Sequence, residues 1–218
     1  MTVFLTHNRV KLALHTLRAA EGPALLLLHA LGDRSPAEVP PDVAGWPGPV
    51  YALDFTGHGA SSVPAGGGYT AEVLMGDADI ALAALGRATL VGRGLGGYIA
   101  LLLAGARPRE VAGAAILDGA GLAGGGDRPG PAVVRGVPGA VSAPHPFALV
   151  ELGSDIRPPD YVRRFAELAV EHSPLRDPIA VCGRMRPEWL RAVLDVPGVR
   201  EEPLESALAR FAAAARPD

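Results

Sequence analysis

The segment from Thr89 to Ala100 constrains the fold of this chain more than any other segment. An apolar run ends there in a cluster of glycines, and a second apolar run of helix-compatible residues begins at once. This order predicts a buried strand, a sharp turn and the first turn of a helix. Backbone N–H groups are unpaired at a helix start and the helix dipole favours negative charge there, so the turn is a candidate binding site.

Two motifs overlap in this turn. Gly92-x-Gly94-x-Gly96 has the spacing of a nucleophile elbow, with glycine where a serine is expected. Gly92-x-Gly94-x-x-Gly97 has the spacing of a dinucleotide-binding fingerprint. Asp118 then stands about where that second motif needs an acid for the ribose. The two interpretations imply different functions.

Short apolar runs alternate with helical patterns along most of the chain. Strands are expected over residues 10–17, 24–28, 50–53, 88–91, 112–117 and 179–182, with a short segment near 199. Helices are expected over residues 71–85, from the glycine turn to 106, and over 160–171, 187–194 and 203–215. This alternation predicts an α/β fold, in which a mostly parallel sheet carries helices on both faces, and a single domain over residues 1–218.

Composition excludes several classes of protein. Hydrophobic residues make up 49% of the chain and the net charge is −3, so no nucleic-acid partner is expected. Cys182 is the single cysteine, which excludes an internal disulfide and a cysteine-based metal site, and no metal or other cofactor is predicted. The aliphatic run 24–28 is far too short to cross a membrane. The expected location is therefore cytoplasmic, with a small molecule as the partner.

Four segments, taken together, resemble the α/β-hydrolase fold superfamily. They are Leu28–Gly32, similar to the family's His-Gly turn after its third strand; Asp54–Ser61, similar to the turn after the fourth; Val91–Gly97, similar to its elbow; and Ile116–Asp118, similar to the end of its sixth strand. The resemblance covers about residues 10–120 and favours the elbow over the dinucleotide fingerprint. It also implies a reduced, cap-like insertion at about residues 122–175.

The resemblance implies a Ser-His-acid relay, and each of its three positions is unsuited to that chemistry. Glycine 94 stands at the nucleophile position and has no side chain. The base is expected within residues 196–203, but no histidine follows His172. The acid is expected after the strand 179–182, where the sequence is Gly-Arg-Met-Arg-Pro. Serine hydrolysis is therefore expected to be lost, because the members of such a relay act as a unit.

The backbone half of the machinery does not depend on these side chains. By the resemblance, the oxyanion donors would be the N–H groups of Leu31 and Leu95, and a glycine at position 94 would leave space beside them. Arg93 and His29 are candidate neighbours of the same pocket. The chain is thus expected to bind a small carbonyl or carboxylate compound at this elbow and oxyanion pocket.

Two alternatives stay open. The first is an enzyme on the same fold that uses other chemistry, as a lyase, cyclase, decarboxylase or water-activating hydrolase, with Asp118, His145 or His172 as acid or base. The second is dinucleotide binding through the overlapping glycine motif. Structural roles are the competing explanation for each residue, such as a strained turn at Gly94 and a buried, hydrogen-bonded imidazole at His29.

Overall fold

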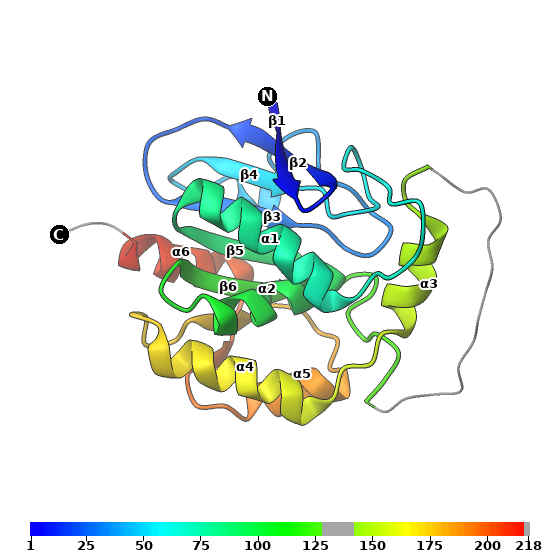
Figure 1. The fold of residues 1–218 in the computed structure, drawn as a ribbon. Helices are drawn as coiled ribbons and strands as arrows, with labels where there is room; N and C mark the ends of the chain where they lie inside the picture. The colour runs from blue at the N-terminus through cyan, green and yellow to red at the C-terminus, as the bar shows by residue number, and fades with distance from the viewer. Residues whose placement is uncertain (128–141, 216–218) are drawn as a thin grey trace.

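The computed structural model describes residues 1–127 and 142–215 of the chain. Within these ranges eight strands form one sheet in the order β1-β2-β4-β3-β5-β6-β7-β8 (Figure 1). The strands are β1 Thr2–His7, β2 Val10–Arg18, β3 Ala24–Leu28, β4 Val50–Leu53, β5 Ala88–Arg93, β6 Val111–Leu117, β7 Ile179–Val181 and β8 Val199–Glu201. Strand β2 is antiparallel to β1 and β4, and the remaining pairs are parallel. The predicted α/β class and mostly parallel sheet are confirmed.

Helices cover both faces of this sheet. They are α1 Ala71–Leu85, α2 Leu95–Ala106, α3 Pro146–Ser154, α4 Pro159–His172, α5 Glu188–Leu194 and α6 Leu204–Ala214, with a short 3-10 helix η1 Pro41–Val43. Helix α2 packs between α1 and α4, and α4 packs on α5 (Figure 1). Helix α6 lies against η1 and β6 and covers the opposite face. Each face therefore encloses its own apolar cluster.

Strand β3 shows why the central strands are apolar at every position. Leu26 and Leu28 belong to the cluster beneath α1, α2, α4 and α5, whereas Leu25 and Leu27 belong to the cluster beneath α6. Successive side chains of a strand point to opposite faces, so a strand with helices on both sides needs apolar residues throughout. Strands β3 and β5 pair in parallel, so their carboxyl ends lie side by side. These ends carry the candidate site.

Two elements were not expected from the sequence. Strand β1 forms a hairpin with β2 in which His7 pairs with Val10, and Asn8 adopts a positive φ of 55° in the two-residue turn. Helix α3 follows the Gly- and Pro-rich segment after residue 122. The proposed insertion 122–175 thus contains α3 together with α4, which packs on the main body through α2 and α5.

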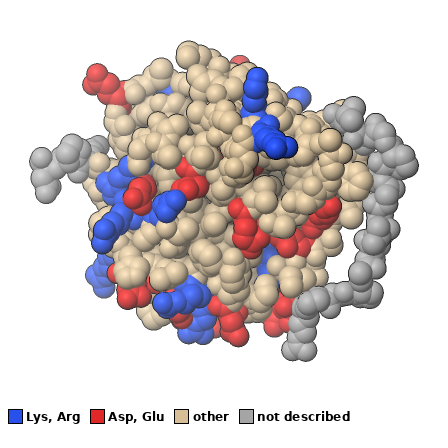
Figure 2. All heavy atoms as spheres, in the orientation of Figure 1, with Lys and Arg blue, Asp and Glu red and all other residues tan. Residues whose placement is uncertain are grey.

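The described surface carries charges of both signs. On the face drawn in Figure 2, Lys and Arg side chains stand next to Asp and Glu side chains rather than forming one basic or acidic stripe. None of the helices in the described part of the chain combines the length and the apolar character that a membrane span requires.

Candidate functional site

The elbow lies between β5 and α2. Gly94 is the residue before the first turn of α2 and has φ 54° and ψ −121°, a conformation that side-chain-bearing residues seldom adopt. Close packing explains two neighbouring glycines: a Cβ on Gly92 would lie 2.2 Å from the Gly96 carbonyl oxygen, and a Cβ on Gly96 would lie 2.3 Å from the Leu28 carbonyl oxygen. The glycines therefore allow α2 to start directly against β5 and β3.

The two expected oxyanion donors converge on a single atom. The Leu95 N–H donates to the Ala120 carbonyl oxygen at 2.9 Å, and the Leu31 N–H donates to the same oxygen at 3.1 Å. A carbonyl oxygen that receives two backbone N–H groups at the start of a helix is held as an oxyanion hole holds its ligand. Here the oxygen belongs to the chain itself, in the loop that follows β6.

The same loop fills the space beside Gly94. A Cβ on Gly94 would lie 2.1 Å from the Ala120 carbonyl oxygen and 2.6 Å from the Gly119 carbonyl carbon. The expectation that glycine at position 94 leaves open space beside the donors is therefore wrong. Backbone from the loop after β6 takes that space, which a local sequence motif does not reveal.

Asp118 ties two loops together at this edge of the sheet. Its carboxylate oxygens accept hydrogen bonds from the Arg184 N–H at 2.7 Å and the Met185 N–H at 2.8 Å. Both bonds hold the loop after β7 beside the end of β6. The carboxylate that was a candidate acid, base or ribose ligand is thus engaged on both oxygens with the protein backbone.

The two candidate histidines of the insertion lie in different places. His145 precedes α3, is 1% exposed and shares a 2.9 Å hydrogen bond between its Nδ1 and the Tyr69 hydroxyl. Burial raises the pKa of Tyr69 to about 12, so its hydroxyl stays protonated at neutral pH. His172 is an exposed residue at the end of α4 with Glu171 beside it at 3.9 Å. Neither residue is among the nearest neighbours of a Cβ built on Gly94, which belong to Gly119 and Ala120.

His29 follows β3 and is fully hydrogen-bonded inside the protein. Its Nδ1 contacts the Ala30 carbonyl oxygen at 2.7 Å, and its Nε2 accepts the Phe55 N–H at 3.1 Å. These partners fix a neutral imidazole with its proton on Nδ1. Burial, and secondly the neighbouring His58, lower the pKa of His29 to about 4. The residue supports the turn after β4 as a neutral side chain.

Arg93 points to the opposite face of the sheet from α2. It shares a face of β5 with Val91, which belongs to the cluster under α6, and it forms an ion pair with Asp42 in η1. A small cavity of about 160 Å³ lies there, with His29, Arg93 and Asp42 among its lining residues. The four candidate binding residues therefore separate into the donor pair of Leu31 and Leu95 and a second group around this cavity.

The base is expected in the segment between β8 and α6, and the acid in the segment after β7. Only Glu202 and Pro203 separate β8 from α6, and Glu202 forms an ion pair with Arg210. After β7, burial raises the pKa of the Cys182 thiol to about 12, which keeps it protonated and unreactive. Among the described residues, no group of three or more His, Cys, Asp or Glu side chains is placed to hold a metal ion.

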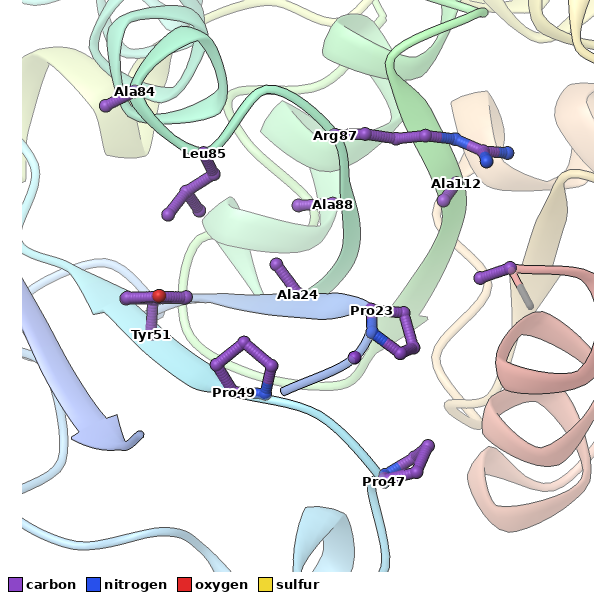
Figure 3. A pocket seen from close by; sticks show the side chains of 12 residues that line it. Pro23, Ala24, Pro47, Pro49, Tyr51, Ala84, Leu85, Arg87, Ala88 and Ala112 are labelled. Carbon is purple, nitrogen blue, oxygen red and sulfur yellow. The ribbon is translucent and has the colours of Figure 1, made fainter. Parts of the chain in front are cut away.

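A larger groove of about 730 Å³ lies at the opposite edge of the sheet, where β3 and β5 begin. Figure 3 shows prolines, alanines, Leu85 and Tyr51 around it, and Arg87 is the one charged side chain labelled there. None of the candidate site residues lines this groove. Ligands of open α/β sheets bind at the carboxyl ends of the strands, so the groove lies at the edge where they are not expected.

Ala120 is the residue of the candidate site that the sequence did not indicate. It contributes its backbone carbonyl, so its side chain carries no signal, but the Gly-Ala-Gly sequence at 119–121 is compatible with a loop that approaches other backbone closely. Gly121 has a φ of 77° and faces the Cβ atoms of Leu31 and Leu95.

Comparison with known proteins bears on the fold and family of this chain. The comparison with curated proteins found no match. Among solved structures, N-formylmaleamic acid deformylase from Pseudomonas putida S16 has a TM-score of 0.68 at 14% identity, covering 93% of this chain and 92% of that protein. A hypothetical protein from Pseudomonas aeruginosa PAO1 has a TM-score of 0.67 at 19% identity, covering 97% and 98%. The thioesterase domain from the curacin biosynthetic pathway has a TM-score of 0.66 at 16% identity, covering 99% and 97%.

These likenesses concern the fold, because the identities are low. The family described as alpha/beta hydrolase fold matches residues 23–176, which include the His-Gly turn, the elbow and β6. With the strand order and the elbow conformation, this match identifies the chain as a member of the alpha/beta hydrolase family.

Proposed function

We propose that this chain is a non-hydrolytic member of the alpha/beta hydrolase family that binds a small carbonyl or carboxylate compound through the N–H groups of Leu31 and Leu95. The observation that carries the proposal is their convergence, at 3.1 and 2.9 Å, on the Ala120 carbonyl oxygen. That oxygen marks where a ligand oxygen would bind. A ligand enters when the loop around Ala120 moves aside.

The loop has the composition that such a movement needs. Gly119 and Gly121 flank Ala120, and glycine changes backbone conformation at little steric cost. Opening leaves the Leu95 N–H at the start of α2 and the Leu31 N–H after β3 without a partner, and a ligand carbonyl or carboxylate restores both hydrogen bonds. The internal carbonyl is therefore a competitor of the ligand.

The absence of hydrolysis rests on side chains. Position 94 has no nucleophile, no histidine lies in the segment between β8 and α6, and the loop after β7 presents arginines. The three candidate acids and bases of the non-serine alternative are placed unfavourably for catalysis. Both Asp118 oxygens accept backbone N–H groups, and His172 is exposed at the end of α4. His145 is buried and shares a hydrogen bond with the Tyr69 hydroxyl. The same use of Asp118 removes the ribose ligand that dinucleotide binding requires.

NMR titration tests the binding step. We expect acetate or a small keto acid to shift the Leu31 and Leu95 amide resonances in a saturable way. Leu95→Pro should abolish the effect, because proline has no N–H and is tolerated at the first position of a helix. Leu95→Val is the matched control, since it alters the same side chain but keeps the donor. Equal binding by both variants would contradict the proposal.

Activity assays test the second half of the proposal. Neither simple esters nor a fluorophosphonate probe should react with the protein above the level of the buffer. Stoichiometric labelling of a serine, or efficient ester turnover, would overturn the assignment as a non-hydrolytic protein.

A further inference from the structure

Arg157 is buried at the junction of α3 and α4. Its side chain is 1% exposed, and its guanidinium lies over the Tyr98 ring of α2, with Cζ 4.1 Å from the ring centroid. Its Nη1 donates to the Leu122 carbonyl oxygen, which also accepts the Trp189 indole N–H at 2.9 Å. The residue thus joins the loop after β6 to α2 and α5.

One edge of this guanidinium has no partner among the described residues. Nε and Nη2 are both buried, and neither makes a hydrogen bond within residues 1–127 and 142–215. These two nitrogens form the side-on edge of the planar group, whose paired N–H groups match two oxygens of a carboxylate or phosphate. Buried polar groups in native proteins nearly always have partners, so a whole unpaired edge indicates a missing ligand.

The charge of Arg157 is compensated only from a distance within the described ranges. No described carboxylate forms a salt bridge with it; Asp155 attracts the guanidinium electrostatically and accepts a hydrogen bond from the Ala71 N–H at 3.2 Å. Burial lowers the pKa of Arg157 to about 10. A water molecule would accept the N–H groups but add no charge, whereas an anion would accept both N–H groups and add a contacting counter-ion to the distant Asp155.

A pocket of about 420 Å³ borders Arg157. Among its described lining residues are two further arginines, Arg186 and Arg191, and two acidic residues, Asp127 and Glu188. Arg186 is held by Glu201 at 2.8 Å and by the Gly183 carbonyl oxygen at 2.9 Å, so its position is fixed. Because Glu201 compensates Arg186, the positive charge that favours an anion in this pocket comes from Arg157 and Arg191.

Gly124 packs closely against the unpaired edge. A Cβ at this position would lie 2.7 Å from the Arg157 Nε. The backbone of the same loop is tied to Arg157 and its neighbour, since the Arg157 N–H donates to the Gly126 carbonyl oxygen and the Gly125 N–H donates to the Asp155 carbonyl oxygen, both at 2.8 Å. The loop therefore presents its least bulky residue to the guanidinium.

We infer that Arg157, supported by Arg186 and Arg191, forms a binding site for a small oxyanion, a carboxylate or phosphate group whose two oxygens pair with Nε and Nη2. The site is separate from the donor pair of Leu31 and Leu95 and does not depend on the function proposed for that pair. Because Nε and Nη2 are closed to water in the ligand-free chain, the loop 123–126 shifts to admit the anion.

The two tryptophans of the chain provide the test. Trp189 shares the Leu122 carbonyl oxygen with Arg157, whereas the Trp46 indole N–H donates to the Pro23 carbonyl oxygen at the far edge of the sheet. In an NMR titration with acetate and with inorganic phosphate, the Trp189 indole resonance should shift in a saturable way and the Trp46 resonance should not. Sodium chloride at equal ionic strength should shift neither. Response to one anion alone identifies a carboxylate or a phosphate as the natural group.

Three variants test whether the shift comes from the Arg157 pocket. Arg157→Lys keeps the charge but removes the fork, and we expect at least tenfold weaker binding. Arg191→Gln should weaken binding several-fold without entering the core, so it tests the site even if the first variant does not fold. Arg109→Gln removes an exposed arginine away from the pocket and should change nothing.

The inference is overturned by the absence of a saturable Trp189 shift with both anions, by an equal shift with chloride, or by equal effects of Arg191→Gln and Arg109→Gln. Leu95→Pro separates this site from the proposed function. That variant should lose the response of the Leu31 amide and retain the response of the Trp189 indole, so failure at one site leaves the other measurable.

Discussion

At the scale of single residues, Gly94 and Ala120 are coupled. The conformation of Gly94 brings the Leu95 N–H to the same point as the Leu31 N–H, and the Ala120 carbonyl occupies that point. A side chain at position 94 would compete with this carbonyl for the same space. The glycine is therefore required both by its backbone conformation and by close packing of the loop after β6.

Gly94→Ala should destabilise the protein more than Gly86→Ala. Both glycines have a positive φ, 54° and 76°, but a Cβ at position 86 would meet no atom within 4 Å. Alanine at position 86 should lower the free energy of unfolding only through its unfavourable positive φ, by about 1–2 kcal/mol. The alanine at 94 also displaces the Ala120 carbonyl, an added loss of about 1–3 kcal/mol. Urea unfolding of both variants measures the difference, and equal losses would show that the loop yields without cost.

At the scale of elements, α6 is positioned by contacts with the sheet. Phe211 of α6 is fully buried, and a Cβ on Gly113 of β6 would lie 2.4 Å from its ring. The aromatic ring thus lies directly on the backbone of β6. Helix α6 and η1 together complete the face of the sheet that the other helices leave uncovered.

Phe211→Ala should cost about 3–5 kcal/mol of unfolding free energy, because it removes a large side chain from a core that cannot collapse around the gap. Phe4→Ala is the matched control, since Phe4 is 58% exposed on the edge strand β1. Its cost should stay within about 0.5 kcal/mol. Denaturant midpoints at constant m-value provide the measurement, and a loss below that of Phe4→Ala would contradict the packing described for α6.

At the scale of the whole molecule, buried ionisable groups link folding to pH. His29 and His58 lie with ring centroids 5.0 Å apart inside the protein, and burial lowers the pKa of both. The folded state thus holds neutral imidazoles where the unfolded state takes up protons.

The single domain over residues 1–218 stays a prediction, and so does the insertion at 122–175.

The free energy of unfolding should fall as the pH drops from about 6.5 towards 4. The pKa of His29 falls from 6.5 to about 4 on folding. The contribution of His29 to the free energy of unfolding is therefore fully present above pH 6.5, the pKa in the unfolded chain. It decreases by about 3 kcal/mol as the pH falls to about 4, the pKa in the folded protein. Chemical unfolding between pH 4 and 7 measures this slope. His29→Gln should flatten it, whereas His172→Gln, at an exposed position, should not; an unchanged slope in His29→Gln would refute the assignment.

Local pattern was enough to predict much of the fold. The apolar runs of β3 to β6 and the helical periods of α1, α2 and α4 lie in the sequence itself, because side-chain direction repeats at the period of each element. Strand β1 could have been found from the Asn8-Arg9 turn between two runs of alternating character. Helix α3 follows a Gly- and Pro-rich stretch that has no clear period.

The sequence by itself determined the class of fold, the elbow glycines and the chemistry that position 94 cannot supply, because each depends on residue type and short-range spacing. Only the tertiary structure decided what the elbow holds. The Ala120 carbonyl, the bonds of Asp118 to the loop after β7 and the unpaired edge of Arg157 all arise where distant segments meet. Backbone groups are the same in every residue, so their partners are fixed by the packing of the chain and not by its local pattern.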